Sequence, residues 1–159
     1  MDLIPVPEET ARVARAAFPK GNVYVAMRDR LNLWYQDSAF APLFQSRGSH
    51  PAESPGRLAL LTVMQFAERL SDLQVAEAVR SHIDWKYALG LELADPGFHH
   101  EVLGDFRQRL AAGGIERQLL DDMLRRFQEQ GLLKTRRKRR VDSTHVLAAI
   151  EELNRLQAS

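Results

Sequence analysis

Residues 57–70 read RLALLTVMQFAERL, and this stretch decides the fold of the chain. Nearly every position is apolar, so a helix formed here has no clear polar face. A helix of that kind is normally central and buried. The four residues that follow, Ser71-Asp72-Leu73-Gln74, match a capping box, in which the serine and glutamine side chains satisfy free backbone N–H groups at a helix start. The sequence therefore predicts a buried central helix and a second helix that begins after Ser71.

Glycine and proline divide the rest of the chain into segments of helical length, and β-branched runs typical of strands are scarce. The helix after Ser71 is followed by a short one closed by Gly90, and two helices joined so tightly resemble a helix-turn-helix. Further helices are predicted over 7–18, after Asn22, after Asp37 or Ser38, over about 99–112 and over about 115–130. We therefore predict an all-α fold, a multi-helix bundle over residues 1–131.

Composition excludes several classes of protein. Hydrophobic residues make up 45% and charged residues 27% of the 159 positions, as in folded globular domains. The chain has no cysteine, which excludes disulfides and thiolate metal sites. The N-terminus carries acids where a signal peptide needs cations, and it has no apolar run of membrane-spanning length. We expect a cytoplasmic protein with no membrane partner.

The basic residues are concentrated in one place, although the net charge is only +1. The segment KTRRKRR at 134–140 holds six of the 22 lysines and arginines and no acid. Adjacent cations neutralise DNA phosphates and release counterions, which gives binding that depends on salt and little on base sequence. We therefore predict a basic linker over 132–140, with DNA-contacting side chains at Lys134, Arg136, Arg137, Lys138, Arg139 and Arg140.

The residues after the basic linker leave two interpretations open. In the first, the linker is merely solvated, and Asp142, Ser143 or Thr144 caps a helix that runs through Ile150 and Leu153. In the second, Asp142 ends a strand and holds a divalent cation together with acids from later in the chain, because phosphoryl transfer with two metal ions uses hard carboxylate ligands. Spacing favours the first interpretation, since such a cap is a common helix start.

Several stretches of the chain resemble insertion-sequence transposases of the DDE type and their InsH-like N-terminal domain. The string VDSTHV at 141–146, followed by LAAIEELNRL, is similar to the segment around the first catalytic aspartate of these enzymes. The N-terminal residues from Ile4 onward, the long stretch 57–93 and the stretch DPGFHHEVLGDFRQRL at 95–110 are similar to their N-terminal domain. Together these stretches cover most of the chain.

The resemblance implies DNA transposition by an RNase H-like catalytic domain that holds Mg²⁺ through two aspartates and a glutamate. Only the first acid maps onto this sequence, at Asp142, which becomes the predicted catalytic and metal-binding residue. Residues 141–159 then correspond to the first strand and helix of a truncated catalytic domain. Because one carboxylate does not complete a two-metal site, we do not expect this chain to bind Mg²⁺ stably or to be active alone.

The resemblance also implies that the partner is DNA, specifically transposon ends. Selective recognition needs a helix in the major groove, and the candidates are the helix after Ser71 and an exposed face formed by Arg107, Gln108 and Arg109. A solvated bundle surface is the alternative explanation for those arginines. Two other functions stay open: a catalytically inactive helix-turn-helix repressor of transposition that forms a homodimer, and a helical interaction protein whose basic run is only a tail.

Other residues invite functional interpretation and have simpler explanations. His99-His100-Glu101 has metal-binding chemistry, but adjacent histidines are expected to diverge around a helix, and the triplet falls where a helix cap and first turn belong. Trp85 and Tyr87 have the chemistry to stack on bases but are predicted to be core residues. His145 follows the candidate acid, and a histidine after a cap is ordinary.

Overall fold

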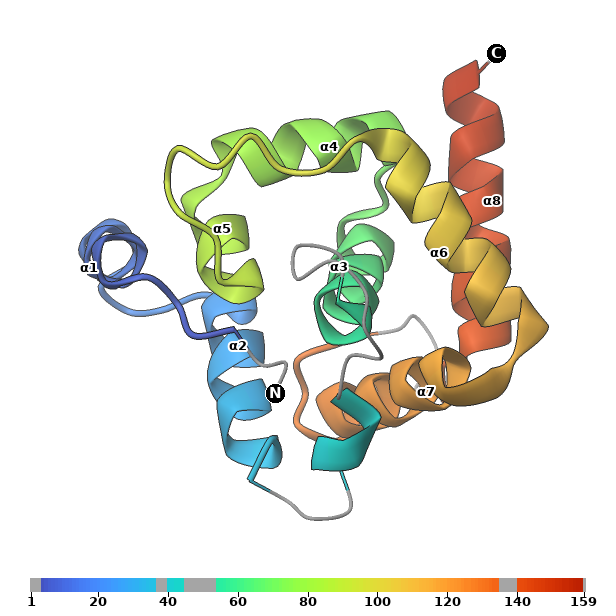
Figure 1. Ribbon diagram of the computed structural model, residues 1–159, viewed down its shortest axis with the longest axis horizontal. Coiled ribbons are helices and arrows are strands. Elements are labelled where there is room, and N and C mark those ends of the chain that lie inside the picture. The colour runs from blue at the N-terminus through green and yellow to red at the C-terminus, as the bar shows by residue number, and fades with distance from the viewer. Residues whose placement is uncertain (1–3, 37–39, 45–53, 135–139, 159) are drawn as a thin grey trace.

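The computed structural model describes residues 4–36, 40–44, 54–134 and 140–158 (Figure 1). Within these ranges the protein is all-helical and has no strand, which confirms the predicted all-α fold. The helices in chain order are α1 (Glu8–Ala17), α2 (Val23–Trp34), the short 3-10 helix η1 (Ala41–Phe44), α3 (Pro55–Glu68), α4 (Asp72–Ser81), α5 (Ile83–Leu89), α6 (His100–Ala112), α7 (Gly114–Glu129) and α8 (Ser143–Ala158).

Helix α3 is the centre of the molecule, as its apolar sequence predicts. It contacts η1, α5, α6, α7 and α8, and Figure 1 shows it surrounded by the other helices. From Pro55 to Phe66 every residue except Arg57 is buried. Ser54 caps the helix by accepting a hydrogen bond from the backbone N–H of Arg57. Pro55 is the first residue of the helix, where a backbone N–H has no partner within the helix, so the N–H that proline lacks is not needed.

Helix α4 begins at the predicted capping box. The backbone N–H of Gln74 donates to Ser71 Oγ over 3.3 Å, and the N–H of Ser71 donates to Gln74 Oε1 over 2.9 Å. A single residue, His82, separates α4 from α5. Trp85 and Tyr87 of α5 are 1% and 3% exposed, which confirms both as core residues.

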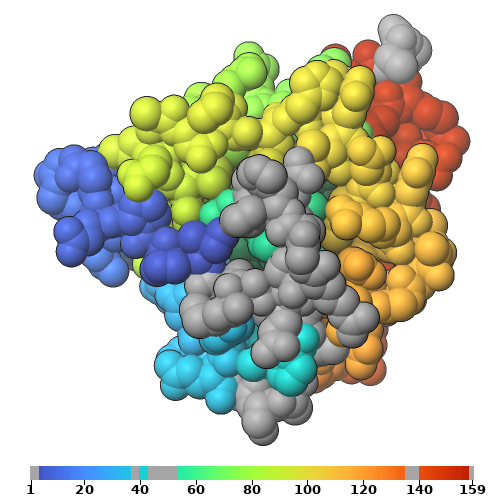
Figure 2. Space-filling model, viewed as in Figure 1, coloured from blue at the N-terminus to red at the C-terminus, as the bar shows by residue number. Residues whose placement is uncertain are grey.

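Both ends of the described chain are held by its middle, and α1 and α8 lie at opposite edges of the molecule (Figures 1 and 2). The hydroxyl of Thr10 in α1 donates to the backbone carbonyl of Leu91 over 2.7 Å. At the other end, Asn154 Oδ1 of α8 accepts from the backbone N–H of Asp72 over 2.8 Å. Segments more than 80 residues apart therefore meet on each side of α3.

The predicted strand at Val141-Asp142 is wrong. Residues 140–142 are irregular, and α8 begins at Ser143. A single strand without a sheet has no partners for its backbone groups, whereas a helix pairs its own. Val146 and Ile150 of α8 are fully buried, and the helix packs against α3, α6 and α7. The residues after the basic run therefore contribute to the same hydrophobic core as α3.

No helix in the described ranges is both long enough and apolar enough to cross a membrane.

Candidate nucleic-acid interface

The basic run is anchored on both sides. Leu133 before it and Val141 after it are each 4% exposed and belong to the hydrophobic core. Lys134 and Arg140, the described ends of the run, are exposed. The predicted DNA-contacting residues Arg136, Arg137, Lys138 and Arg139 lie outside the described residues. The run therefore leaves and re-enters the core at fixed points, which does not fit the interpretation of a terminal tail.

Asp142 is the cap of α8. Its Oδ1 accepts a hydrogen bond from the backbone N–H of His145 over 2.9 Å, and the side chain is exposed. This is the geometry that the first interpretation of the segment predicts. The ring of His145 meets the ring of Phe66 edge to face with centroids 5.7 Å apart.

A second aspartate, Asp121 of α7, also holds the start of α8. Its Oδ1 accepts from the backbone N–H of Ser143 over 2.8 Å and from Ser143 Oγ over 2.5 Å. Arg117 of α7 donates to Thr144 Oγ1. The sequence does not predict these contacts, because a cap supplied by a distant helix leaves no mark in local spacing.

Arg117, Asp121 and Asp142 line a hollow of about 510 Å³ between α7 and the start of α8. Its lining contains three arginines and three aspartates, and Asp122 forms ion pairs with Arg125, which also lines the hollow, and with Arg126. Among the described residues, no group of three histidine or acidic side chains that includes Asp142 lies close enough to share a metal ion. Asp142 is thus an exposed acid whose neighbouring carboxylates Asp121 and Asp122 are already engaged.

The expected exposure of Arg107 is wrong. Its Nη1 and Nη2 bind Asp72 Oδ1 and Oδ2 at 2.8 and 2.5 Å, and the two side chains are only 18% and 15% exposed. Asp72 also accepts from Gln65 Nε2 over 2.8 Å. Burial by itself raises the pKa of Asp72, but the hydrogen bonds from Arg107 and Gln65 and the charge of Arg107 outweigh it, so this pKa lies below the ordinary aspartate value. Helical spacing showed which face Arg107 occupies but not that α4 covers it.

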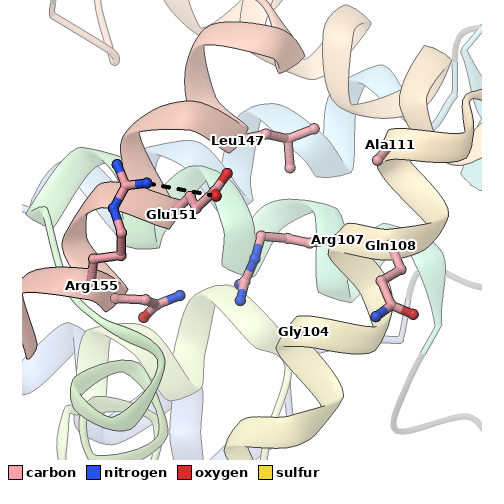
Figure 3. Close-up of a pocket in the computed structure, with 8 residues that line it drawn as sticks. Gly104, Arg107, Gln108, Ala111, Leu147, Glu151 and Arg155 are labelled. Atoms are coloured by element: carbon pink, nitrogen blue, oxygen red, sulfur yellow. Dashed lines mark ion pairs between the residues drawn. The ribbon is translucent and has the colours of Figure 1, made fainter. Parts of the chain in front are cut away.

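A groove of about 650 Å³ lies between α6 and α8 (Figure 3). Arg107 reaches into it from α6, while Glu151 and Arg155 of α8 form an ion pair across from it (Figure 3). Gly104 lies in its α6 wall, and a Cβ there would meet only Arg107 Nη2, at 3.9 Å. Arg109, the other predicted arginine of α6, is exposed and lies 5.3 Å from the centre of the Phe106 ring.

The helix pair α4 and α5 does not present its second helix to solvent. Residues 85–89 of α5 are all buried, and α5 packs against α1 and α2. A helix that reads DNA must expose side chains to the major groove. The exposed side chains of the pair are on α4, where they include Gln74, Glu77 and Arg80. If one of these two helices contacts DNA, it is α4.

His99 and His100 do not diverge, contrary to the expectation from the sequence. Their rings stack with centroids 4.5 Å apart, and ligand atoms of both and of Glu101 lie within 4.8 Å of one another. The reason is that His99 is the cap, with an extended backbone, rather than the first residue of α6. The Nδ1 atom of His99 accepts a hydrogen bond from the backbone N–H of Glu101 over 3.3 Å, so this nitrogen is not free to bind a metal ion.

The fold and the charge distribution define a helical domain whose cations are concentrated in one anchored segment. The family model described as Transposase domain (DUF772) matches residues 12–109, well over half of the chain, and the protein belongs to this family. No curated protein and no solved structure matches the chain. The family confirms the resemblance to transposases and supports a role in transposition. The match spans α1 to α6 and ends before the basic run and Asp142.

Proposed function

We propose that the protein binds DNA as the N-terminal domain of a transposase and that residues 134–140 supply most of the contact. The observation that carries the proposal is the anchoring of this run between Leu133 and Val141, with Lys134 and Arg140 exposed. Outside the run, the chain carries 16 basic against 21 acidic residues. A polyanion is therefore attracted to this segment rather than to the surface as a whole.

Base selectivity requires a second contact, because a cationic run reads phosphates and not bases. The exposed face of α4 and the exposed Arg109 are the surfaces assigned to it. Arg107 is assigned an indirect part: it neutralises Asp72 at the start of α4 and so removes a negative charge that would repel DNA there.

We propose further that Asp142 is the first acid of a DDE triad and that Mg²⁺ binds when two other acids of the triad are brought to it. The support is the similarity of VDSTHV to the family's catalytic segment and the exposure of the Asp142 carboxylate. Its capping bond to His145 uses Oδ1, and no described residue forms a hydrogen bond with Oδ2. A carboxylate has lone pairs for both tasks.

The alternative is a repressor that occupies transposon ends without cutting them. The engagement of Asp121 and Asp122 in other contacts favours it for this chain taken alone. Mg²⁺-dependent cleavage of bound DNA by the purified chain would contradict this alternative.

The test is a salt titration of DNA binding with duplexes carrying the element's terminal repeats and with scrambled duplexes. Each lost phosphate contact reduces the steepness of log K against log salt by about 0.9. Replacing Arg139 and Arg140 by glutamine should therefore flatten the slope by roughly 2. The matched control replaces Lys20 and Arg30, two exposed cations far from the run in sequence, and should leave the slope unchanged. Equal effects of the two double variants, or no binding at low salt, would overturn the proposal.

A further inference from the structure

A second concentration of positive charge lies at the opposite end of the sequence from the basic run. A hollow of about 490 Å³ opens between the segment before α1, helix α1 and helix α2. Its polar lining consists of Arg15 from α1, Arg28 and Asn32 from α2, Tyr87 from α5 and one acid, Glu8. Figure 1 shows that α1, α2 and α5 lie together at this edge.

Arg28 is buried without a carboxylate partner. It is 3% exposed, and its Nε and Nη1 donate to Asn32 Oδ1 and to the carbonyl of Ala88, each over 3.0 Å. Nη2 donates to the carbonyl of Ile4. A guanidinium has five N–H groups, so two of them have no acceptor within the described residues. All three acceptors are neutral, and no ion pair of Arg28 occurs in the described ranges.

The charge around Arg28 is therefore incompletely balanced. Burial, together with the neighbouring cation Arg57, lowers the pKa of Arg28 to about 10, although the charges of Tyr87 and Asp29 oppose the shift. A buried charge is normally paired, because leaving it unpaired costs free energy. A bound anion would supply the missing negative charge.

Arg15 places a second cation at the same hollow. It is exposed and has no hydrogen bond or ion pair with a described residue. The neighbouring arginine of α1, Arg12, is instead paired with Glu9 and does not line the hollow. Two guanidinium groups that line one hollow from different helices can bind phosphate oxygens through several charge-assisted hydrogen bonds.

We propose that this hollow binds a phosphate group, held by Arg15 and Arg28, with Asn32 as a further donor. Glu8 is the one acid in the lining, and it opposes binding. The phosphate comes either from a DNA backbone or from a small phosphate anion. Only in the first case does the inference rest on the proposed function.

The experiment measures binding of inorganic phosphate and pyrophosphate by the rise in Tm and by chemical shifts in NMR spectra, with chloride at equal ionic strength as reference. Arg15→Gln should weaken phosphate binding about tenfold, the effect expected for one lost charge-assisted contact. Arg12→Gln is the matched control on the same helix and should change nothing. Glu8→Gln should tighten binding, while Glu9→Gln should not. These side chains are exposed, so the variants are expected to fold.

Equal responses of Arg15→Gln and the wild type, or no response to phosphate or pyrophosphate, would overturn the inference, whatever the protein does with DNA. A parallel measurement of DNA binding by the same variants then tells whether the phosphate comes from a DNA backbone or from a small anion. If the source is DNA, Arg15→Gln reduces DNA affinity and flattens its salt dependence, and phosphate competes. If the source is a small anion, phosphate binding follows the variants while DNA binding does not. Loss of DNA binding alone would refute the proposed function and leave this site intact.

Discussion

The contact between Asp72 and Arg107 should be among the strongest polar contributions to stability. It joins the first residue of α4 to α6 through two hydrogen bonds of 2.8 and 2.5 Å. Removing one partner of a fully buried pair costs about 3–5 kcal/mol. Because these side chains are 15% and 18% exposed, we expect a smaller loss, about 2 kcal/mol, for Asp72→Asn or Arg107→Gln.

The double variant measures the interaction itself. Once one partner is absent, removing the other should cost little more, so the coupling energy should be roughly 1–2 kcal/mol. Urea unfolding followed by circular dichroism gives each free energy, with the m-value checked for constancy. Single losses below about 0.5 kcal/mol, the range of ordinary surface substitutions, would refute the reasoning.

Lowering the pH should remove the stabilisation that the contact between Asp72 and Arg107 provides. The pKa of Asp72 is lower in the folded protein than in the unfolded chain, so its stabilisation is fully present above the unfolded value of about 3.9. It is lost as the pH falls through the folded pKa. The stability difference between the wild type and Asp72→Asn should therefore be constant near neutral pH and shrink below about pH 4.

Two further substitutions test separate parts of the structure. Gly104→Ala should stabilise α6 by about 0.5–1 kcal/mol and raise the Tm by a few degrees, because glycine is a poor helix former. The new Cβ would meet only Arg107 Nη2, at 3.9 Å, so there is room for it. A lower Tm would contradict this and show that the groove does not accommodate a side chain at position 104. Asp121→Ala should cost about 1–2 kcal/mol and lower hydrogen-exchange protection in α8 more than in α3, because Ser143 loses two hydrogen bonds. Asp121→Asn, which keeps an acceptor, should cost less, and uniform loss of protection in both helices would contradict the assignment.

Local signals in the sequence predicted the framework of the fold. The unbroken apolar stretch identified α3 as central, and the box from Ser71 to Gln74 located the start of α4 to the residue. Trp85 was predicted correctly as core because it lies between apolar segments. These features depend on residues within one or two helical turns of each other.

What the sequence did not predict depends on which helices meet. Helical periodicity placed Arg107 on the polar side of α6, but the acid that pairs with it is 35 residues away. The capping of Ser143 by Asp121 is likewise a contact between helices. The stacking of His99 on His100 escaped prediction because side chains of adjacent residues diverge only where both backbones are helical, and the backbone of His99 is extended.

The attachment of both chain ends to the middle bears on how the protein forms during synthesis. Leu91, the acceptor for Thr10, is made long after α1 has left the ribosome, and Asn154 follows Asp72 by a similar interval. Short helices such as α1, with 10 residues, are marginal in water before they dock. Domains generally form as units during translation. Most of residues 4–158 must therefore emerge before both α1 and α8 can dock, and until then part of the apolar surface of α3 remains uncovered.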